Sequence, residues 1–314
     1  MSAQRIIFAC PFPRDQITGG IRTTYRHAEM LARRGVDCVV ISPDGHPSWF
    51  QSEAQVHRGQ GLTLRGDEVI VVNEIIDEVM QSFLRLPGTK QMFCQNHFYA
   101  FGPRLGMRDH AELGISSVYC SSVAIREFYQ NVYGYPAPDI VPYAVDSALF
   151  APAEKQLRIA FIPRKLPFEA GFIRSSFQKK YPAYRAVPWV AIEGRSERET
   201  ADILSESAVF LALGHRESFG LPAIEAMAAG CAVVGFHGTG GLEFAAPENG
   251  VWFDGGRLLE CVDALHGVAR GIDRGDASVA RMIAAGRATA ADYNLDRTRT
   301  ALFRHFGIPD EGRP

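Results

Sequence analysis

Two carboxylates lie close together in the most informative stretch of the chain, residues 208–236, AVFLALGHRESFGLPAIEAMAAGCAVVGF. Glu217 lies in a polar loop, and Glu225 lies one turn into the helix that the next residues predict, with seven residues between the two. A carboxylate accepts hydrogen bonds from hydroxyl groups. The spacing places one carboxylate at each end of a phosphate-sized gap, so the pair suits the ribose and the sugar of a sugar nucleotide.

The residues around the two carboxylates predict a strand, a loop, a helix and a second strand. The first apolar run ends at Leu213, Pro222 fits the start of a helix, and Gly230 ends that helix. In a parallel sheet such a loop lies at the carboxyl edge, where the helix N-terminus presents unpaired N–H groups and a partial positive charge. We therefore expect an anion such as a diphosphate there. The alternative is that Glu217 is a solvated loop charge and that Glu225 only complements the helix dipole.

The rest of the chain alternates short apolar runs with amphipathic segments of helix length, which is typical of an α/β protein with parallel sheets. The predicted strands are 6–10, 36–41, 69–72, 91–94, 117–120, 157–162, 187–192, 208–213, 232–236 and 251–253, and the predicted helices include 23–34, 123–133 and 296–306. Four prolines in 135–152 favour a domain boundary there. We expect an N-terminal domain at 1–145, a C-terminal domain at 146–292, and a final helix in 293–314 that packs on either domain.

Composition excludes several classes of protein. A net charge of -2 over 314 residues argues against a nucleic-acid binder that works by bulk positive charge. The six cysteines form no C-x-x-C pair, so neither a zinc ribbon nor a disulfide scaffold is expected, and a reducing cytoplasm fits best. No run approaches the roughly 20 apolar residues of a membrane span, and the N-terminal apolar stretch is too short for a signal peptide. We expect a cytoplasmic protein that is soluble or at most peripheral on the membrane.

The string ESFGLPAIEAMAAGCAVVG closely resembles the signature of retaining glycosyltransferases of the GT-B fold. This family 4 type group includes glycogen-synthase-like and mannosyltransferase-like enzymes. The resemblance implies two Rossmann-like α/β domains whose parallel sheets face each other across a cleft, with the acceptor on the first domain and the donor on the second. It further implies that Glu225 holds the donor ribose and that Glu217 contacts the transferred sugar. Backbone amides that touch the diphosphate are expected from Ser218, Phe219, Gly220 and Leu221.

The resemblance extends to the N-terminal half of the chain. Gly19 and Gly20, in the string TGGI, are similar to a Gly-rich loop that faces the diphosphate and the acceptor in this family; the alternative is a plain turn between strand and helix. His97, in FCQNHFYAF, follows a predicted strand, and the resemblance implies that it contacts the sugar; a structural histidine is the alternative. The string VPYAVDSALF resembles the family's linker, in which Asp146 and Phe150 match.

Positive charge is needed near the donor because a nucleoside diphosphate leaving group gains negative charge as the glycosidic bond breaks. Arg164 and Lys165, in FIPRKLP, are placed to supply it; Arg164 matches the family, in which the lysine comes several residues later. Residues 151–190 hold eight Lys and Arg against two Glu, an excess that favours a diphosphate donor, an anionic membrane or an ordinary solvated face. Gly240 and Gly241, in GTGGLE, are expected to contact the donor.

Absent motifs complete the prediction. The sequence has no D-x-D, no H-E-x-x-H and no Walker loop, so we expect catalysis without a metal ion or another cofactor. We expect transfer of a sugar, with retention, from a nucleotide-diphosphate sugar to a saccharide or lipid-linked acceptor in surface polysaccharide or glycoconjugate synthesis. We do not expect nucleic acid as a partner, but we expect peripheral association with the membrane. The alternatives are a nonhydrolysing sugar-nucleotide epimerase on the same fold and a degenerate homologue that only binds a nucleotide.

Overall fold

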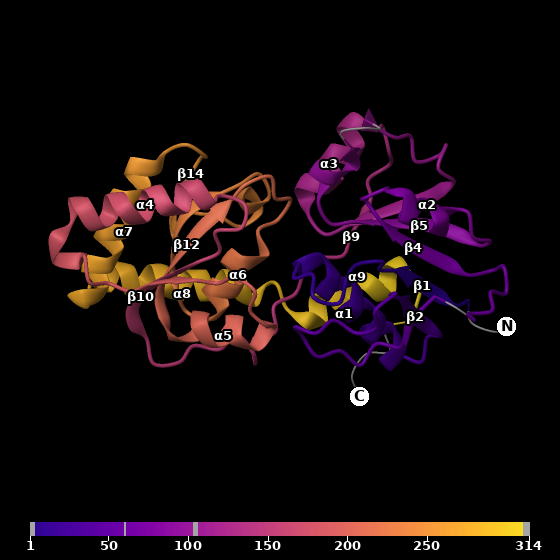
Figure 1. Cartoon of the computed structure of the whole chain (residues 1–314), viewed down its shortest axis with the longest axis horizontal. Helices are drawn as coiled ribbons and strands as arrows, with labels where there is room; N and C mark the ends of the chain where they lie inside the picture. The colour runs from indigo at the N-terminus through magenta and orange to yellow at the C-terminus, as the bar shows by residue number, and fades with distance from the viewer. Residues whose placement is uncertain (1–3, 60, 103–105, 310–314) are drawn as a thin grey trace. The chain divides into compact units, whose positions relative to one another are not determined.

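The protein consists of two compact units (Figure 1). Unit 1 comprises Met1–Tyr143 and Asp296–Pro314, and unit 2 comprises Ala144–Leu295. The computed structural model describes residues 4–59, 61–102 and 106–309. Each unit is an α/β structure built on a parallel sheet, so the predicted fold class is confirmed.

Unit 1 contains a seven-stranded parallel sheet in the order β3-β2-β1-β4-β5-β8-β9. The strands are β1 (Ile6–Ala9), β2 (Cys38–Ile41), β3 (Val56–His57), β4 (Val69–Asn73), β5 (Thr89–Cys94), β8 (Ile115–Cys120) and β9 (Asp139–Ile140). A separate antiparallel pair is formed by β6 (Phe101–Gly102) and β7 (Gly106–Met107). The chain runs outward from β1 and then returns to β4 on the other side of β1. Ligands of such sheets bind at this reversal, outside the carboxyl ends of the strands.

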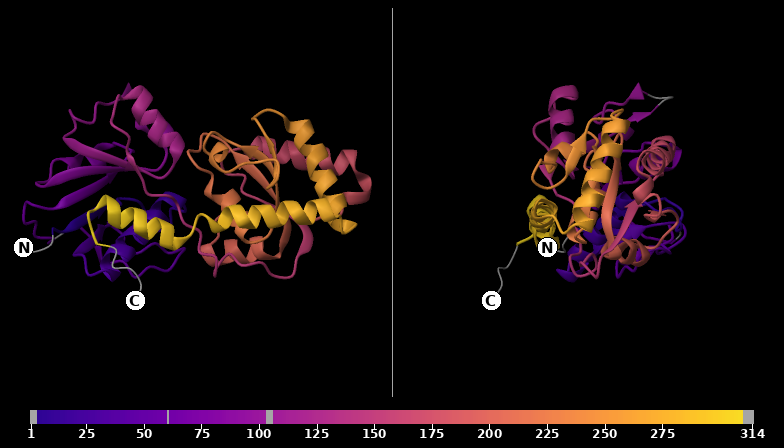
Figure 2. Two further views of the ribbon diagram at one scale, coloured as in Figure 1. Left: turned by 180° about the vertical axis from the view of Figure 1, so that it is seen from behind. Right: turned by 90° about the vertical axis from the view of Figure 1, so that its left-hand side faces the viewer.

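Helices cover both faces of this sheet because alternate strand residues point to opposite sides. Phe8 packs with α1 (Gly19–Arg33) and α9 (Leu295–His305), whereas Ile7 packs with α2 (Glu78–Leu84) and α3 (Val123–Val132). The last helix, yellow in Figures 1 and 2, thus shares a core with the first, to which it contributes Leu302 and Phe303. The Thr298 hydroxyl also donates to the Pro142 carbonyl at 2.8 Å.

The first helix begins four residues earlier than its sequence predicts. Thr18 is its N-cap, and the Thr18 hydroxyl accepts a hydrogen bond from the Ile21 amide at 3.3 Å. Such a cap satisfies one of the N–H groups that a helix start leaves unpaired. Gly19 and Gly20 are therefore the first residues of α1, and the prediction of a loop at these positions was wrong.

Unit 2 contains a five-stranded parallel sheet in the order β11-β10-β12-β13-β14. The strands are β10 (Gln156–Phe161), β11 (Trp189–Ala191), β12 (Ser207–Gly214), β13 (Ala232–His237) and β14 (Val251–Phe253). Helices α4 (Pro167–Lys180) and α7 (Leu258–Asp273) cover one face; α5 (Glu197–Glu206) and α6 (Leu221–Ala228) cover the other, with α8 (Ala277–Ala291) beside α6. Short helices are η1 (His97–Ala100) in unit 1 and η2 (Pro182–Tyr184) and η3 (Gly240–Glu243) in unit 2. The strand order reverses between β10 and β12.

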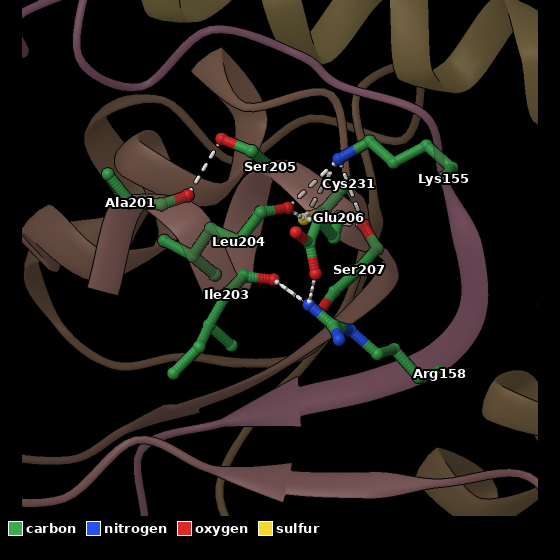
Figure 3. Close-up of polar contacts among 9 residues, drawn as sticks. All are labelled: Lys155, Arg158, Ala201, Ile203, Leu204, Ser205, Glu206, Ser207 and Cys231. Atoms are coloured by element: carbon green, nitrogen blue, oxygen red, sulfur yellow. Dashed lines mark hydrogen bonds and ion pairs between the residues drawn. The ribbon is translucent and has the colours of Figure 1, made fainter. Parts of the chain in front are cut away.

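Two basic side chains bind the carbonyl groups at the amino edge of this sheet (Figure 3). Lys155 Nζ donates to the carbonyls of Leu204, Ser207 and Ala229 at 2.9, 3.0 and 2.5 Å. These hydrogen bonds link the C-terminal end of α5 to that of α6. Arg158 Nη2 donates to the Ile203 carbonyl at 3.0 Å. A helix C-terminus leaves carbonyls unpaired and carries partial negative charge, so both cations stabilise the ends of these helices.

These contacts bear on the basic excess in 151–190. Lys155 and Arg158 are bound at helix ends, Lys165 pairs with Glu217, and Lys180 pairs with Asp263. Half of the eight basic side chains in the stretch are therefore engaged in contacts within unit 2. The local excess of positive charge does not form one free basic face.

Replacing Lys155 by methionine should lower the free energy of unfolding by about 2–4 kcal/mol, because three carbonyls lose a charged donor. Chemical denaturation of both proteins measures the difference. Lys179→Met, on the exposed side of α4, is the matched control and should change stability by less than about 0.5 kcal/mol. Equal stability of the two variants would contradict a helix-capping role for Lys155.

Candidate active site

An ion pair spans the reversal of strand order in unit 2. Lys165 lies in the loop after β10 and Glu217 in the loop after β12, and Lys165 Nζ lies 3.1 Å from Glu217 Oε1. Their side chains are only 18% and 20% exposed. Burial lowers the pKa of Lys165, while the Glu217 carboxylate acts in the opposite direction. Neighbouring parallel strands thus bring together residues that are 52 positions apart in the sequence.

The backbone after β12 turns sharply to begin α6. Arg216 has a φ of +45°, which is rare for a residue with a side chain, and its carbonyl accepts from Lys165 Nζ at 3.3 Å. Gly220 has a φ of +97° and is the N-cap of α6, with no side chain capping the helix. Strain of this kind is common where a loop is held for function. A short turn therefore connects Glu217, and with it the ion pair, to the N-terminus of α6.

A glycine allows the loop after β13 to pack directly on this turn. The Gly240 amide donates to the Glu217 carbonyl at 2.8 Å. A Cβ atom at Gly240 would lie 1.9 Å from the carbonyl carbon of Ser218 and 2.0 Å from the nitrogen of Phe219. A Cβ atom at Gly241 would lie 3.0 Å from Cβ of His237, whose Nε2 lies 3.2 Å from Asp254 Oδ1. This contact between the loops leaves no room for any side chain at Gly240.

The other predicted residues of unit 2 lie near the Lys165–Glu217 ion pair in the sequence or in the fold, but not all of them contact it. Ser218, Phe219 and Leu221 are buried around the start of α6. Glu225 is 4% exposed and lies in the second turn of that helix. Arg164 is adjacent to Lys165 but has an exposed side chain. The residue that directly contacts Glu217 is thus Lys165, although the family resemblance favours Arg164.

The predicted residues of unit 1 lie at the carboxyl edge of its own sheet. Gly20 is in the first turn of α1, and its carbonyl accepts a hydrogen bond from Gln95 Nε2 at 3.1 Å. His97 is the first residue of η1, a helical turn where sequence predicts a loop. Its ring stacks on Phe128 with 5.0 Å between the centroids, and burial lowers the pKa of His97.

Sequence reasoning missed Glu74, Gln95 and His237. Glu74 directly follows β4 and Gln95 directly follows β5, whereas His237 is the last residue of β13. Their positions at strand ends were the available signal, because strand ends of one parallel sheet share an edge. Apolar runs show where such strands end, but the pairing of the strands decides which ends are neighbours.

The described part of the chain holds neither a metal-ligand cluster nor a membrane-spanning helix. In the ranges 4–59, 61–102 and 106–309, no group of three or more His, Cys, Asp and Glu side chains is arranged to hold a metal ion. No helix in the same ranges is long and apolar enough to cross a membrane. All six cysteines are buried, and none of them forms a disulfide bond.

Substitution of Gly240 by alanine should lower the free energy of unfolding by about 1–3 kcal/mol, because the new methyl group must displace backbone at Ser218 and Phe219. Gly255→Ala is the matched control in the same unit. A Cβ atom there meets open space, so its effect should stay within about 0.5 kcal/mol. Thermal or chemical unfolding compares the two, and a Gly240→Ala protein as stable as Gly255→Ala would contradict the close packing of the loops.

Comparison with known proteins gives the family. Residues 190–267, which include the β12–α6 turn and the loop after β13, match the family model of glycosyl transferases group 1. The chain is 30% identical over 252 residues to an alpha-1,6-glucosyltransferase of Actinobacillus pleuropneumoniae serotype 7, covering 74% of this chain and 72% of that protein.

Solved structures share the fold at low sequence identity. Sucrose-phosphate synthase from Thermosynechococcus elongatus has a TM-score of 0.71 at 13% identity, over 97% of this chain and 98% of that one. HepE from Anabaena, solved in complex with UDP-glucose, has a TM-score of 0.69 at 13% identity, over 96% of this chain and 99% of that one. The chain therefore belongs to the glycosyl transferases group 1 family and has the GT-B fold.

Proposed function

We propose that this glycosyltransferase moves a sugar from a nucleotide-diphosphate donor to a saccharide or lipid-linked acceptor, with retention and without a metal ion. The observation that carries the proposal is the Lys165–Glu217 pair beside the N-terminus of α6. A cation, a carboxylate and a helix N-terminus at one strand edge suit a ligand with both phosphate and hydroxyl groups. The UDP-glucose in the HepE structure and the glucosyltransferase relative support a donor of this class.

The donor diphosphate binds at the start of α6 in this proposal. Backbone amides of residues 218–221 and the partial positive charge of the helix N-terminus contact its oxygens. Lys165 and Arg164 stabilise the charge that the leaving nucleoside diphosphate gains, and Lys165 also orients the Glu217 carboxylate. Glu217 accepts hydrogen bonds from the sugar, and Glu225 accepts them from the ribose. Gly240 keeps the loop after β13 against this turn.

The residues on the donor side support the proposal of retention and metal independence. None of the donor-side residues assigned above is proposed as a nucleophile, which favours attack by the acceptor on the face that the leaving group departs from, through an oxocarbenium-like state. The leaving group is stabilised by Lys165, Arg164 and a helix N-terminus, in place of a cation held by a D-x-D motif, which the sequence lacks. Unit 1 supplies the acceptor-side residues Gly19, Gly20 and His97. We assign the enzyme to glycoconjugate or surface polysaccharide synthesis in the cytoplasm, with peripheral membrane association.

Nucleotide binding followed by product analysis tests this function. UDP-, GDP- and dTDP-sugars are screened by thermal shift, since a ligand at 100 times its dissociation constant adds about 2.7 kcal/mol of stability. The binding donor should then release its nucleoside diphosphate, form a product with the donor's anomeric configuration, and do both equally in excess EDTA. An inverted product, strict dependence on Mg²⁺ or Mn²⁺, or an epimerised sugar nucleotide formed without acceptor would each contradict part of the proposal.

Replacing Glu225 and replacing Glu217 should have different effects on nucleotide affinity and turnover. Glu225→Ala should raise the dissociation constant of the nucleoside diphosphate about 10-fold or more, because a charged acceptor of the ribose hydroxyls is lost. Glu217→Ala should leave that constant nearly unchanged and reduce turnover about 10²–10³-fold. Calorimetry and initial rates on the same preparations measure both quantities. Glu248→Ala, in an exposed loop of unit 2, is the control, and equal loss of nucleotide affinity in Glu217→Ala and Glu225→Ala would contradict the assigned roles.

A further inference from the structure

A buried carboxylate lies at the reversal of strand order in unit 1. Glu74 directly follows β4 and is 6% exposed, and its Oε1 accepts a hydrogen bond from the Asn96 amide at 2.8 Å. Burial raises the pKa of Glu74 to about 7, although hydrogen bonds from backbone amides, including those of Gln95 and Asn96, act in the opposite direction. The titratable groups that face it are the Cys94 thiol and the Tyr129 hydroxyl, whose pKa values burial raises far above their ordinary range.

The turn that Glu74 binds connects two parts of the carboxyl edge. Gln95 lies in this turn, and its Nε2 donates to the Gly20 carbonyl at the start of α1. Asn96 is the N-cap of η1, and its Oδ1 accepts a hydrogen bond from the Phe98 amide at 3.2 Å. His97 is the first residue of that short helix. One carboxylate therefore holds the segment that carries both Gln95 and His97.

Polar atoms without partners lie along the same edge. Gln95 Oε1 and Ser121 Oγ have no hydrogen-bond partner among the residues that the structure describes, although Gln95 is 9% exposed and Ser121 is fully buried. Gln95 follows β5 and Ser121 follows β8, and these strands are neighbours in the sheet. Buried polar atoms are almost always paired, so these two oxygens call for a partner that the described residues do not supply. A carbonyl oxygen and a hydroxyl group suit a ligand rich in hydroxyl groups.

We propose that Glu74 is a positioning residue for acceptor binding: its carboxylate fixes the turn 95–97, so that Gln95 and His97 are presented to a hydroxyl-rich acceptor beside Gly20. This inference rests on the proposed function, because the acceptor is the substrate assigned to unit 1. Glu74 acts through the Asn96 amide and does not touch the substrate. The ionised carboxylate is the stronger acceptor for backbone N–H groups, so the turn is held best above the pKa of Glu74.

Three variants separate positioning from simple stabilisation. Glu74→Ala removes the contact with the Asn96 amide, and Glu74→Gln keeps an acceptor oxygen but cannot ionise. Asp77→Ala is the matched control, because Asp77 lies three residues away and its Oδ1 accepts from the Met80 amide at the same distance of 2.8 Å. The first measurement is the pKa of His97 by NMR, with the His97 signals identified from a His97→Gln protein. It requires no enzymatic activity.

Glu74→Ala should raise the pKa of His97 toward its ordinary value, because a loosened turn exposes the ring to water. In Glu74→Gln and Asp77→Ala the pKa of His97 should stay low. An unchanged pKa of His97 in a folded Glu74→Ala protein would overturn the proposal, whether or not the enzyme transfers sugar.

The second measurement uses UDP-glucose as donor and methyl α-glucoside as acceptor probe. Glu74→Ala should raise the KM for the glucoside about 10-fold while the dissociation constant of UDP stays unchanged, and Glu74→Gln should restore the KM to within about 3-fold. The wild-type kcat/KM for the glucoside should rise with pH in a one-proton step near 7, by no more than the roughly 3-fold that separates Glu74→Gln from wild type, because the carboxylate forms there, and Glu74→Gln should lack this step.

Each failure has a separate meaning. A pH step that persists in Glu74→Gln, or a KM change as large in Asp77→Ala, would overturn the positioning role. Absence of transfer from every sugar nucleotide in the wild-type protein would instead reject the proposed function, and the pKa of His97 would still decide whether Glu74 holds the turn.

Discussion

A helix that follows a parallel strand leaves unpaired N–H groups at the carboxyl edge of the sheet and unpaired carbonyls at the amino edge. In unit 2, every residue of which the structure describes, the two edges are treated differently. At the amino edge, Lys155 and Arg158 bind carbonyls in the last turn of α5. Lys155 also binds the carbonyl of the residue that follows α6. At the carboxyl edge, α6 begins at Gly220 without a side-chain cap. The same helix is therefore bound by a basic side chain at its C-terminal end and has no side-chain cap at its N-terminal end.

The two units place an acidic residue at the reversal of strand order in different environments. Each has an acidic residue after a strand that borders the reversal of strand order, Glu217 after β12 and Glu74 after β4. Glu217 is partly exposed, and its side chain pairs with that of Lys165. Glu74 is buried and bound to a backbone amide, and burial raises its pKa. The first environment suits contact with substrate, and the second suits holding a turn.

Glycine sets how closely the loops of unit 2 approach one another. Gly220 supplies a positive φ at the start of α6, and Gly240 lets the loop after β13 lie against the backbone of Ser218 and Phe219. Both were singled out in the sequence as residues that contact a ligand. The structure shows that Gly220 permits the positive φ of the turn and that Gly240 permits close packing of backbone. A residue that permits such packing and one that touches the ligand have the same appearance in a sequence.

The sequence by itself predicted the strand–loop–helix pattern around Glu217 and, in the described residues, every strand except the two-residue strands β3, β6, β7 and β9, because apolar periodicity depends on neighbouring residues. The GT-B fold was implied by the resemblance of one local motif to a known family. Two local predictions were wrong. Because Thr18 caps α1, Gly19 and Gly20 belong to that helix and not to a loop, and His97 lies in a helical turn. Strand order decided the rest. Only the pairing of β10 with β12 brings Lys165 to Glu217, and only the neighbouring ends of β4 and β5 bring Glu74 to Asn96. Such contacts join residues tens of positions apart, and no local pattern encodes which strands become neighbours.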